Sequence, residues 1–272
     1  MIRELENASS YMDFARSFAD DPVFSDPLLL NEKQVKKNLL ETDRSPDKHM
    51  FGVFADNQIT GLFVFYVIED EHYMEMLAGL SRQKQAYDEM FDYMKHNYEG
   101  YDADFIFNPQ NYLLKNILEE KKAEFCEEQQ TMYFTHVPLE SDNDVIAFSP
   151  AYYQQYCDIH DDNGRYWTGE KTARATDRFH IYLALKNDKV IGYTDVTYGF
   201  DENEPIDLFV KEEYRNQGYG RKLLTKALLD NEPKEMVLQV DVNNAPAVHL
   251  YDSLGFKVRE NRNMITVHWR KI

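Results

Sequence analysis

Apolar and polar positions along the chain group into short continuous apolar runs and into longer segments with helical spacing. In the second half, Ile206–Val210 is a short apolar run of the kind that forms a buried strand. Farther on, Leu223, Leu224, Ala227 and Leu228 recur at the spacing of one helix face. A basic loop that carries two glycines separates the two patterns. The sequence therefore predicts a strand, a loop and a helix in succession.

Two pairs of extended runs predict β-hairpins. Met50–Phe54 and Ile59–Val67 are rich in aromatic and β-branched residues and flank a short polar turn that contains Asp-Asn. Ile181–Leu185 and Val190–Thr197 flank a similar turn in the second half. In each pair a glycine lies near the start of the second strand.

Further elements follow from the same patterns. The first 18 residues predict a short strand and then a helix, and a second helix is expected near Asn31, with Val35, Leu39 and Leu40 facing inward. Helices are also expected at 150–157 and at 168–175, with a loop at 161–165 between them.

The ends of the two halves also predict strands. A strand near Thr131–Val137 is expected to close the first sheet, and Lys257–Trp269 is expected to form a closing pair of strands in the second. His268 is then a residue of a sheet, not a catalytic base.

The chain repeats itself at a fixed offset. Gly61 and Gly192 are 131 positions apart, and so are Phe125 and Phe256. A constant offset at two distant points indicates the duplication of one unit. The fold class is therefore α/β, with two tandem domains that each have a central mixed β-sheet flanked by helices. We expect the domains to span 1–138 and 139–272, because the polar stretch Pro138–Asp144 lies between the copies.

The loop after Ile206–Val210 has the chemistry of an anion site. Gly218 and Gly220 lack a Cβ where the backbone must turn, so successive amides can point into one concavity at the start of the helix. The unpaired amides of the first helical turn carry partial positive charge. Arg215, Arg221 and Lys222 add full charges around them. The sequence therefore predicts a seat for phosphate.

Two motifs together resemble the GNAT superfamily of N-acetyltransferases. The first is Arg215-x-x-Gly218-x-Gly220, and the second is Asn244-x-x-Ala247-x-x-x-Tyr251-x-x-x-Gly255-Phe256. The resemblance implies that acetyl-CoA is the acetyl donor, with its diphosphate on the first motif and its pantetheine arm in an opening between the strand at 206–210 and a parallel neighbour at 236–241. The implied residues for binding acetyl-CoA are Leu208, Phe209, Val210, Arg215, Asn216, Gln217, Gly218, Tyr219, Gly220, Arg221, Lys222, Asn244, Ala247 and Tyr251.

The same resemblance assigns catalytic roles. Tyr251 is the candidate general acid that protonates the departing thiolate, and the alternative is that its ring only packs under the sheet. Glu204 and Asp207 are rival candidates for the base that takes the proton of the amine. Asp195 is a weaker third, and ordered water is a further alternative. Tyr166, Trp167 and Glu170 are candidates for contact with the acceptor, although an aromatic pair there also suits packing.

The first copy differs where this chemistry would lie. Gln85 and Tyr87 are expected in the places of Gly218 and Gly220, and each adds a side chain where the backbone would approach phosphate. Counted back from Phe125, the position that matches Tyr251 is Glu120. We therefore expect a degenerate, structural first domain, with an unrelated α/β domain as the alternative.

Composition limits the partners. The chain has 272 residues, with 48 acidic and 30 basic residues and a net charge of −18, which disfavours nucleic acid and anionic membranes and suits a cationic acceptor. Without an apolar run of membrane-spanning length or a leader-like N-terminus, a cytoplasmic location is expected. Cys126 and Cys157 have no metal-like spacing, and His160 beside Asp161 suggests a solvated polar turn, so no metal is expected.

These observations predict an acetyl-CoA-dependent N-acetyltransferase that acetylates a small-molecule or peptide amine by direct transfer. Two alternatives remain open. The chain could be a non-catalytic acyl-CoA sensor or scaffold, or it could use a longer acyl donor. Neither the acceptor nor the oligomeric state follows from the sequence.

Overall fold

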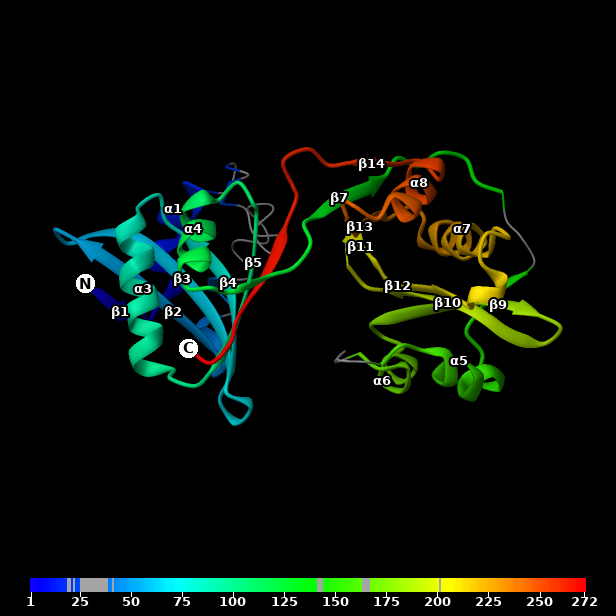
Figure 1. Ribbon diagram of the computed structural model, residues 1–272, viewed down its shortest axis with the longest axis horizontal. Helices are drawn as coiled ribbons and strands as arrows, with labels where there is room; N and C mark the ends of the chain where they lie inside the picture. Colours follow the sequence, from blue (N-terminus) through cyan, green and yellow to red (C-terminus); the bar gives the residue numbers. More distant parts are fainter. Residues whose placement is uncertain are drawn as a thin grey trace. The chain divides into compact units, whose positions relative to one another are not determined.

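The computed structural model describes residues 1–18, 21, 23–24, 39–40, 42–140, 144–162, 167–200 and 202–272. The chain forms two compact units (Figure 1), each of which combines β-sheet and helices. The first unit comprises Met1–Gln130, Asp241–Asn243 and Arg259–Ile272, and the second comprises Thr131–Val240 and Asn244–Val258. The helix expected from Asn31 through Val35 lies outside the described residues. Two further residues were expected to face inward from this helix. Leu39 is buried, as expected, but Leu40 is exposed.

The first unit contains a seven-stranded sheet. The strand order is β1-β2-β3-β4-β5-β15-β6, with β4 and β5 parallel and the other neighbours antiparallel. Its strands are β1 (Ile2–Glu4), β2 (Lys48–Ala55), β3 (Gln58–Ile68), β4 (Tyr73–Leu80), β5 (Asp102–Phe107), β6 (Glu124–Phe125) and β15 (Ile265–Trp269). Its helices and 3-10 turns are η1 (Ala8–Tyr11), α1 (Met12–Arg16), η3 (Thr42–Arg44), η4 (Glu69–Glu71), α3 (Lys84–Asn97) and α4 (Tyr112–Glu120).

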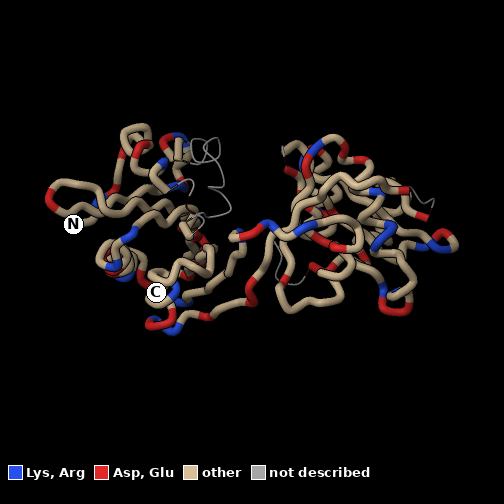
Figure 2. Tube along the Cα trace, turned by 90° about the horizontal axis from the view of Figure 1, so that it is seen from above, with Lys and Arg blue, Asp and Glu red and all other residues tan. Residues whose placement is uncertain are grey.

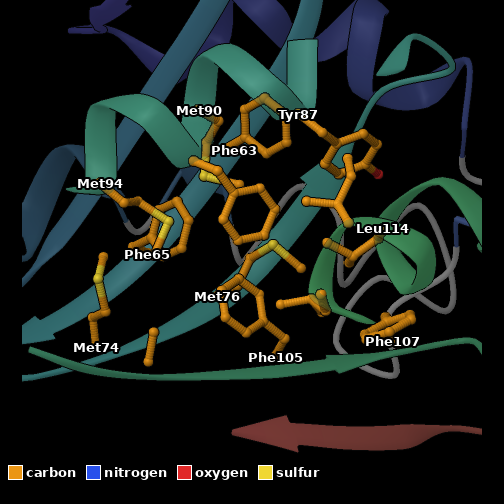
Figure 3. Packing of buried hydrophobic residues seen from close by; sticks show 14 of the residues in the cluster. Phe63, Phe65, Met74, Met76, Tyr87, Met90, Met94, Phe105, Phe107 and Leu114 are labelled. Carbon is orange, nitrogen blue, oxygen red and sulfur yellow. The ribbon is translucent and has the colours of Figure 1, made fainter. Parts of the chain in front are cut away.

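The core of this unit follows from period-two and helical patterns. In β5 every second residue is buried, and Ala103, Phe105 and Phe107 face α3 and α4. Figure 3 shows Phe105 and Phe107 with side chains of α3, among them Met90 and Met94, in one continuous apolar layer. The opposite face of β5 carries Asp102, Asp104 and Ile106, which are only partly buried.

The second unit contains two four-stranded sheets, in the orders β12-β10-β9-β8 and β11-β13-β7-β14. The strands are β7 (Gln129–Phe134), β8 (Val145–Ala147), β9 (Phe179–Lys186), β10 (Lys189–Thr197), β11 (Glu202–Asn203), β12 (Pro205–Val210), β13 (Glu235–Asp241) and β14 (Phe256–Val258). The helices and 3-10 turns are η5 (Pro150–Tyr152), α5 (Tyr153–Ile159), α6 (Gly169–Arg174), η6 (Glu212–Tyr214), α7 (Tyr219–Asn231) and α8 (Ala245–Ser253). The expected helices near 150–157 and 168–175 are confirmed.

The two predicted hairpins are present and share their irregularities. Asp56 and Asn57 in the first turn, and the matching pair in the second, have positive φ, as two-residue hairpin turns require. Each hairpin has a register shift beside its glycine, at Gly61 and at Gly192. A further shift follows Val64 in β3 and Asp195 in β10, again 131 positions apart. Turn and bulges therefore repeat at the offset expected from the sequence.

Two expectations about the closing strands are wrong. β7 pairs with β14 of the second unit and does not close the first sheet. β15 pairs with β5 and β6 of the first unit, so 257–269 is not a pair of adjacent strands. Relative to a boundary at 138, the second unit thus contains β7 from the first half, and the first unit contains β15 from the second half. The division of the structure consequently differs from the single boundary expected at 138.

Charged residues are distributed over both units. Figure 2 shows acidic segments on both units, interleaved with Lys and Arg. Among the described residues, no helix is both long enough and apolar enough to cross a membrane.

Candidate active site in the second unit

The centre of the second unit is a fork between two strands. β11 pairs in parallel with β13 through Glu202 and Asn203 only. The chain then continues as β12, which pairs with β10 and belongs to the other sheet (Figure 1). Among the strands that the structure describes, none pairs with the edge of β12 that faces away from β10, and an extended amide chain can add to such an edge. The opening expected between 206–210 and 236–241 is present.

The loop that follows β12 forms a concave turn at the start of α7. Asn216 has φ of 58° and Gly218 has φ of 85°, and Gly218 is the N-cap of the helix. Left-handed residues in such a turn direct neighbouring amides to one side, and the first-turn amides of α7 add to them. A Cβ built on Gly218 would meet nothing within 4 Å, so the turn is open. Its geometry is that of an anion seat.

A cavity of about 640 Å³ joins the fork to this turn. Its lining comes from the end of β12, the turn, the start of α7 and one side of α8. The lining residues are Leu208, Phe209, Val210, Tyr214, Arg215, Asn216, Gly218, Tyr219, Gly220, Arg221, Asn244, Pro246, Ala247, His249, Leu250 and Ser253. Most of the residues expected to bind acetyl-CoA are therefore brought together.

The cations near the seat have different partners. The Nε of Arg215 donates to the carbonyl of Val210 at 3.0 Å, and Arg221 bonds to Ser253 through its Nη atoms. Both arginines line the cavity. Lys222 is not among the lining residues, and its ammonium forms an ion pair with Asp144. Gln217 also lies off the lining, where its amide donates to the carbonyl of Glu213 at 2.9 Å. The expected direct roles of Lys222 and Gln217 lack support from this geometry.

Asn244 and Ala247 position α8 beside the cavity. The side chain of Asn244 accepts a hydrogen bond from the Ala247 amide at 3.2 Å and so caps the helix. Pro246 follows in the first turn, where its missing N–H costs nothing. Both Asn244 and Ala247 line the cavity. A capping asparagine thus has a structural task here as well as a place in the site.

Tyr251 lies in the last turn of α8. Its ring packs against Phe256 with centroids 5.8 Å apart, in an edge-on arrangement. Burial, and then the negative charge of Asp207, raise the pKa of the Tyr251 hydroxyl, so it stays protonated at neutral pH. Tyr251 is not among the lining residues of the cavity. It can donate a proton, and its ring also has the packing role that was the alternative.

Glu204 lies where the fork opens. It follows the last paired residue of β11, and its carboxylate accepts a hydrogen bond from the backbone N–H of Gln239 on β13. Burial raises the pKa of Glu204 to about 7, and the bond from Gln239 lowers it less. A carboxyl group that titrates near neutral pH can exchange protons in either direction. Glu204 therefore has the pKa of a general base, and it also accepts a hydrogen bond from an amide of β13 across the fork.

Asp207 belongs to a buried polar cluster on the α5 side of the sheet. The hydroxyl of Tyr193 donates to Asp207 at 2.7 Å, and Asp207 lies opposite Asp195 in the register of β10 and β12. Asp195 in turn accepts from the Tyr156 hydroxyl at 2.9 Å and from the His160 ring at 3.0 Å. Asp207 is therefore held by a network within the sheet, unlike Glu204.

The position of His160 in this cluster differs from the one expected. The expectation of a solvated turn is wrong, because its side chain is only 2% exposed and lies between Asp162 and Asp195. Burial alone lowers the pKa of His160, but the bonds to Asp195 and Asp162 and the charge of Asp207 outweigh it, so the pKa is raised. Sequence reasoning missed this contact because 35 positions separate His160 from Asp195.

The cluster His160, Asp195 and Asp207 has donor atoms close enough for a metal ion. Both ring nitrogens of His160 already contact carboxylates, Nδ1 with Asp162 at 2.7 Å and Nε2 with Asp195 at 3.0 Å. A ring between two carboxylates is best satisfied as an imidazolium, which has no lone pair for a metal. The arrangement fits an internal ion network.

None of the three candidates for acceptor contact is found at the cavity in the part of the chain that the structure describes. Tyr166 lies outside the described residues. Trp167 packs edge-on against Phe179, with centroids 4.8 Å apart, and Glu170 pairs with Arg174 in the first turn of α6. Neither Trp167 nor Glu170 lines the cavity at the fork.

The equivalent loop of the first unit has a different conformation. The N-cap of α3 is Gln83, with φ of −122°, so the turn lacks the left-handed geometry of Gly218. The helix starts show that Gln83 and Gln85 replace Gly218 and Gly220, two positions earlier than expected. The caps of α4 and α8, Asn111 and Asn244, are 133 positions apart.

The offset of 133 changes one residue match. Tyr251 corresponds to Leu118 and not to Glu120. Leu118 is fully buried in the apolar core of the first unit. The first unit therefore has a leucine where the second has its candidate acid.

The strand fork, the turn at the start of α7 and the cavity between them define a fold of the GNAT type. Residues 177–258 match a family model described as an acetyltransferase (GNAT) domain. The chain therefore contains a GNAT domain, as the resemblance of its motifs implied, and the first unit is compatible with a second copy.

Curated relatives match less than a third of the chain. The alanine N-acetyltransferase of ribosomal protein bS18 from Escherichia coli is 33% identical over 84 residues, which is 29% of this chain and 56% of that protein. An N-alpha-acetyltransferase from Saccharolobus solfataricus is 29% identical over 93 residues, 28% of this chain and 56% of that protein. The chain thus spans little more than half the length of these relatives.

Solved structures match the whole chain at low identity. A GCN5-related N-acetyltransferase from Sphaerobacter thermophilus has a TM-score of 0.70 at 11% identity, covering 99% of this chain and 95% of that one. A tandem GNAT protein from the clavulanic acid biosynthesis pathway has a TM-score of 0.65 at 11% identity, covering 100% and 98%. At such identity the likeness shows the fold, which is that of a two-unit GNAT protein.

Proposed function

We propose that this protein is an acetyl-CoA-dependent N-acetyltransferase that moves an acetyl group to a primary amine by direct transfer in a ternary complex. The observation that carries the proposal is the cavity of about 640 Å³, which connects the open edge of β12 with the anion turn at the start of α7. The matched GNAT domain and the N-acetyltransferases it resembles support this assignment.

The chain's own groups fit the donor. The amides between Arg215 and Gly220, with the guanidinium groups of Arg215 and Arg221 beside them, would hold the diphosphate. The open edge of β12, at Leu208 and Val210, would pair with the amides of the pantetheine arm. Acetyl-CoA supplies the acetyl group as an activated thioester.

Two residues would move the protons. Glu204, with a pKa of about 7 at the mouth of the fork, accepts the proton that an alkyl ammonium must lose before it attacks, directly or through a water molecule. The protonated hydroxyl of Tyr251 gives its proton to the departing thiolate. Asp207 is the weaker candidate base because Tyr193 and its neighbours in the buried cluster hold it. Neither cysteine lies in the two motifs, which favours direct transfer.

The acceptor is an amine in this proposal. The relatives with similar sequences are named for acetylating the amino groups of proteins, so a peptide N-terminus is the first class to test. The acidic balance of the chain suits an acceptor that arrives with a positive charge. We further propose that the first unit is a degenerate copy with a structural role, because Gln83 and Leu118 replace the residues that form the seat and the acid.

The seat can be tested with two matched glycines. Gly218 and Gly100 have φ of +85° and +86°, and a Cβ on either meets nothing within 4 Å. Replacing either with glutamate imposes the same backbone strain, but only Gly218→Glu places bulk and negative charge in the turn. Isothermal titration should show acetyl-CoA binding lost in Gly218→Glu and retained in Gly100→Glu. Thiol release with a panel of amines should follow binding. Retention of normal affinity by Gly218→Glu would remove the basis for the proposal.

A further inference from the structure

The polar face of the first unit's sheet brings together a cysteine, a histidine and an aspartate. The Sγ of Cys126 lies 3.3 Å from Nε2 of His268, and Nδ1 of His268 lies 2.6 Å from Oδ1 of Asp104. The three residues come from 104, 126 and 268, which meet because β15 inserts between β5 and β6. This cluster belongs to the first unit and shares no residue with the fork of the second.

The hydrogen bonds fix the direction of proton transfer. An ionised carboxylate can only accept, so Nδ1 of His268 donates to Asp104 and Nε2 is left with its lone pair toward the Cys126 thiol. Arg270 pairs with Asp104 at 3.1 Å, and the Tyr73 hydroxyl donates to the same carboxylate at 3.1 Å. Asp104 thus has three partners that fix its orientation. The imidazole is therefore held in the tautomer that accepts a proton from sulfur.

The thiol itself is accessible and needs this base. Cys126 is exposed and follows directly after β6, where its backbone N–H bonds to the carbonyl of Thr266 at 2.9 Å. Burial, and the negative charges of Glu124, Asp104 and Asp241, raise the pKa of the Cys126 thiol, against the opposing charge of Arg270. At neutral pH the sulfur is therefore a thiol, and it becomes a nucleophile when His268 removes its proton.

We propose that Cys126, His268 and Asp104 form a nucleophilic thiol site that accepts acyl groups from thioesters, with Cys126 as nucleophile, His268 as its base and Asp104 as a positioning residue. The S–H proton passes to Nε2 of His268 while sulfur attacks the thioester carbonyl. The tetrahedral intermediate then expels the donor thiolate, which takes the proton from His268. One S–C bond forms and one breaks, so Cys126–SH and an acetyl thioester give S-acetyl-Cys126 and the free donor thiol. The proposal uses acetyl-CoA as one donor and otherwise stands apart from the proposed amine acetylation.

The two cysteines of the chain allow a clean assay. In the full chain carrying Cys157→Ser, Cys126 is the sole thiol, and its alkylation by iodoacetamide at pH 7 is compared with that of the same chain in urea. We expect the folded protein to react at least about tenfold faster than the unfolded chain, since a positioned base contributes at least that much. His268→Gln should bring the ratio below one, because the acidic neighbours then act alone on the thiol. Asp104→Asn should give an intermediate ratio and a changed pH profile.

A matched histidine controls for general effects on the first unit. His49 also bonds to a carboxylate, Glu4 at 2.7 Å, so His49→Gln removes a similar pair away from the thiol and should leave the ratio unchanged. Equal reactivity of folded and unfolded Cys126, or a ratio that does not depend on His268, would overturn the proposal. Near-ultraviolet circular dichroism identifies variants that fail to fold, and for those the chain with His268→Asn provides the second measurement.

Acyl transfer is measured with two thioesters. Acetyl-CoA and the acetyl thioester of N-acetylcysteamine, which lacks the diphosphate, are each incubated with the Cys157→Ser protein, and intact mass shows whether one acetyl group is added. We expect an adduct that hydroxylamine removes, and that is absent in Cys126→Ser. With Gly218→Glu, the small thioester should still acetylate Cys126, so a failure of the acetyl-CoA seat is distinguished from a failure of this site. Alkylation without any acetyl adduct from either thioester would refute the acyl-accepting role.

Discussion

Asn111 and Asn244 do the same thing in the two units: each accepts a hydrogen bond from the amide three residues later, at 3.2 Å, and so caps a nine-residue helix. Only Asn244 lines the cavity at the fork. We expect Asn244→Ala and Asn111→Ala each to lower the free energy of unfolding by about 1 kcal/mol through the lost cap. Only Asn244→Ala should also weaken acetyl-CoA binding, measured by titration calorimetry.

Asn111→Ala is a strict control for the effect of Asn244→Ala on stability. Asn111 also donates to the buried hydroxyl of Tyr87 at 3.1 Å, so its loss should cost at least as much stability as the loss of Asn244. A drop in affinity that followed stability alone would appear in both variants. That result would assign Asn244 a purely structural task.

Tyr251→Phe separates the acid from the packing ring. The substitution keeps the contact with Phe256 and removes only the hydroxyl, so we expect turnover to fall about 10²-fold or more while the Kd for acetyl-CoA changes little. Tyr182→Phe serves as the control, because Tyr182 is a buried tyrosine of the same unit whose hydroxyl bonds to Asp230. It should keep full turnover. Equal losses of turnover and affinity in Tyr251→Phe would show that the residue is structural.

The pKa of about 7 at Glu204 predicts how activity depends on pH. The base form is the carboxylate, so kcat/KM of the wild-type protein should rise as pH increases through about 7. Glu204→Gln should lose this rise and fall by about 10²-fold or more. Activity that kept the same pH profile in Glu204→Gln would point to Asp207 or to water as the base.

The same shift has a consequence for stability. The pKa of Glu204 is higher in the folded state than the ordinary 4.5, so folding favours the protonated form, and stability is lost as pH rises through about 7. Glu204→Gln should therefore be more stable than the wild type at pH 8, by on the order of 1–3 kcal/mol, with little difference at pH 4. Urea unfolding at the two pH values measures this.

Glu75 is the matched control for both effects at Glu204. Ala78 and Asp207 hold equivalent places opposite the bulges of β3 and β10, and Glu75 and Glu204 each lie three residues before them. Burial also raises the pKa of Glu75. Glu75→Gln should share the sign of the stability effect and leave activity unchanged.

Two histidines of the second unit differ mainly in burial. His160 is 2% exposed between Asp162 and Asp195, and His136 is 34% exposed between Glu232 and Glu235. Removing one partner of a buried ion network leaves a buried charge, so His160→Gln should cost about 3 kcal/mol at pH 6, and His136→Gln under about 1 kcal/mol. Similar costs for both variants would mean that the buried network contributes no more than a surface pair.

The pH dependence of this cost has a defined sign. The folded-state pKa of His160 is above its ordinary value, so its contribution is complete below pH 6.5 and is lost as pH rises through the folded value. The stability gap between wild type and His160→Gln should therefore narrow at high pH. A gap that widened would show that His160 is neutral in the folded state.

The local elements were predictable because their causes lie within a few residues. Two polar residues with positive φ set each hairpin turn, and the glycine at 192 is needed because a Cβ there would lie 2.6 Å from the carbonyl oxygen of Phe209. The strand, loop and helix around Gly218 also follow from local chemistry. Of the fourteen residues that the two short motifs implied for binding acetyl-CoA, eleven line the cavity, and Gln217, Lys222 and Tyr251 do not.

The wrong predictions concern contacts between residues that are far apart in the sequence, which no local pattern determines. A short strand such as β7 or β15 can pair in more than one sheet, and only the tertiary structure decides which sheet it joins. The segments between matching elements differ in length between the copies. The offset is 131 at the hairpins, 135 at the N-caps of α3 and α7 and 133 at the N-caps of α4 and α8, so Leu118, not Glu120, matches Tyr251. The contact between His160 and Asp195 was hidden for the same reason.

The position of β15 predicts that the first 138 residues cannot fold by themselves. β15 lies between β5 and β6, and it contributes the buried Ile265 and Val267, with Ile272 beyond it. Burial of these three side chains is worth about 5–9 kcal/mol, which is comparable to the stability of a whole domain. A chain of residues 1–138 should therefore lack the near-ultraviolet circular dichroism of a packed core. Addition of a peptide spanning 259–272 should restore it. A scrambled peptide of the same composition is the control, and a well-packed monomer of 1–138 without any peptide would contradict the strand assignment.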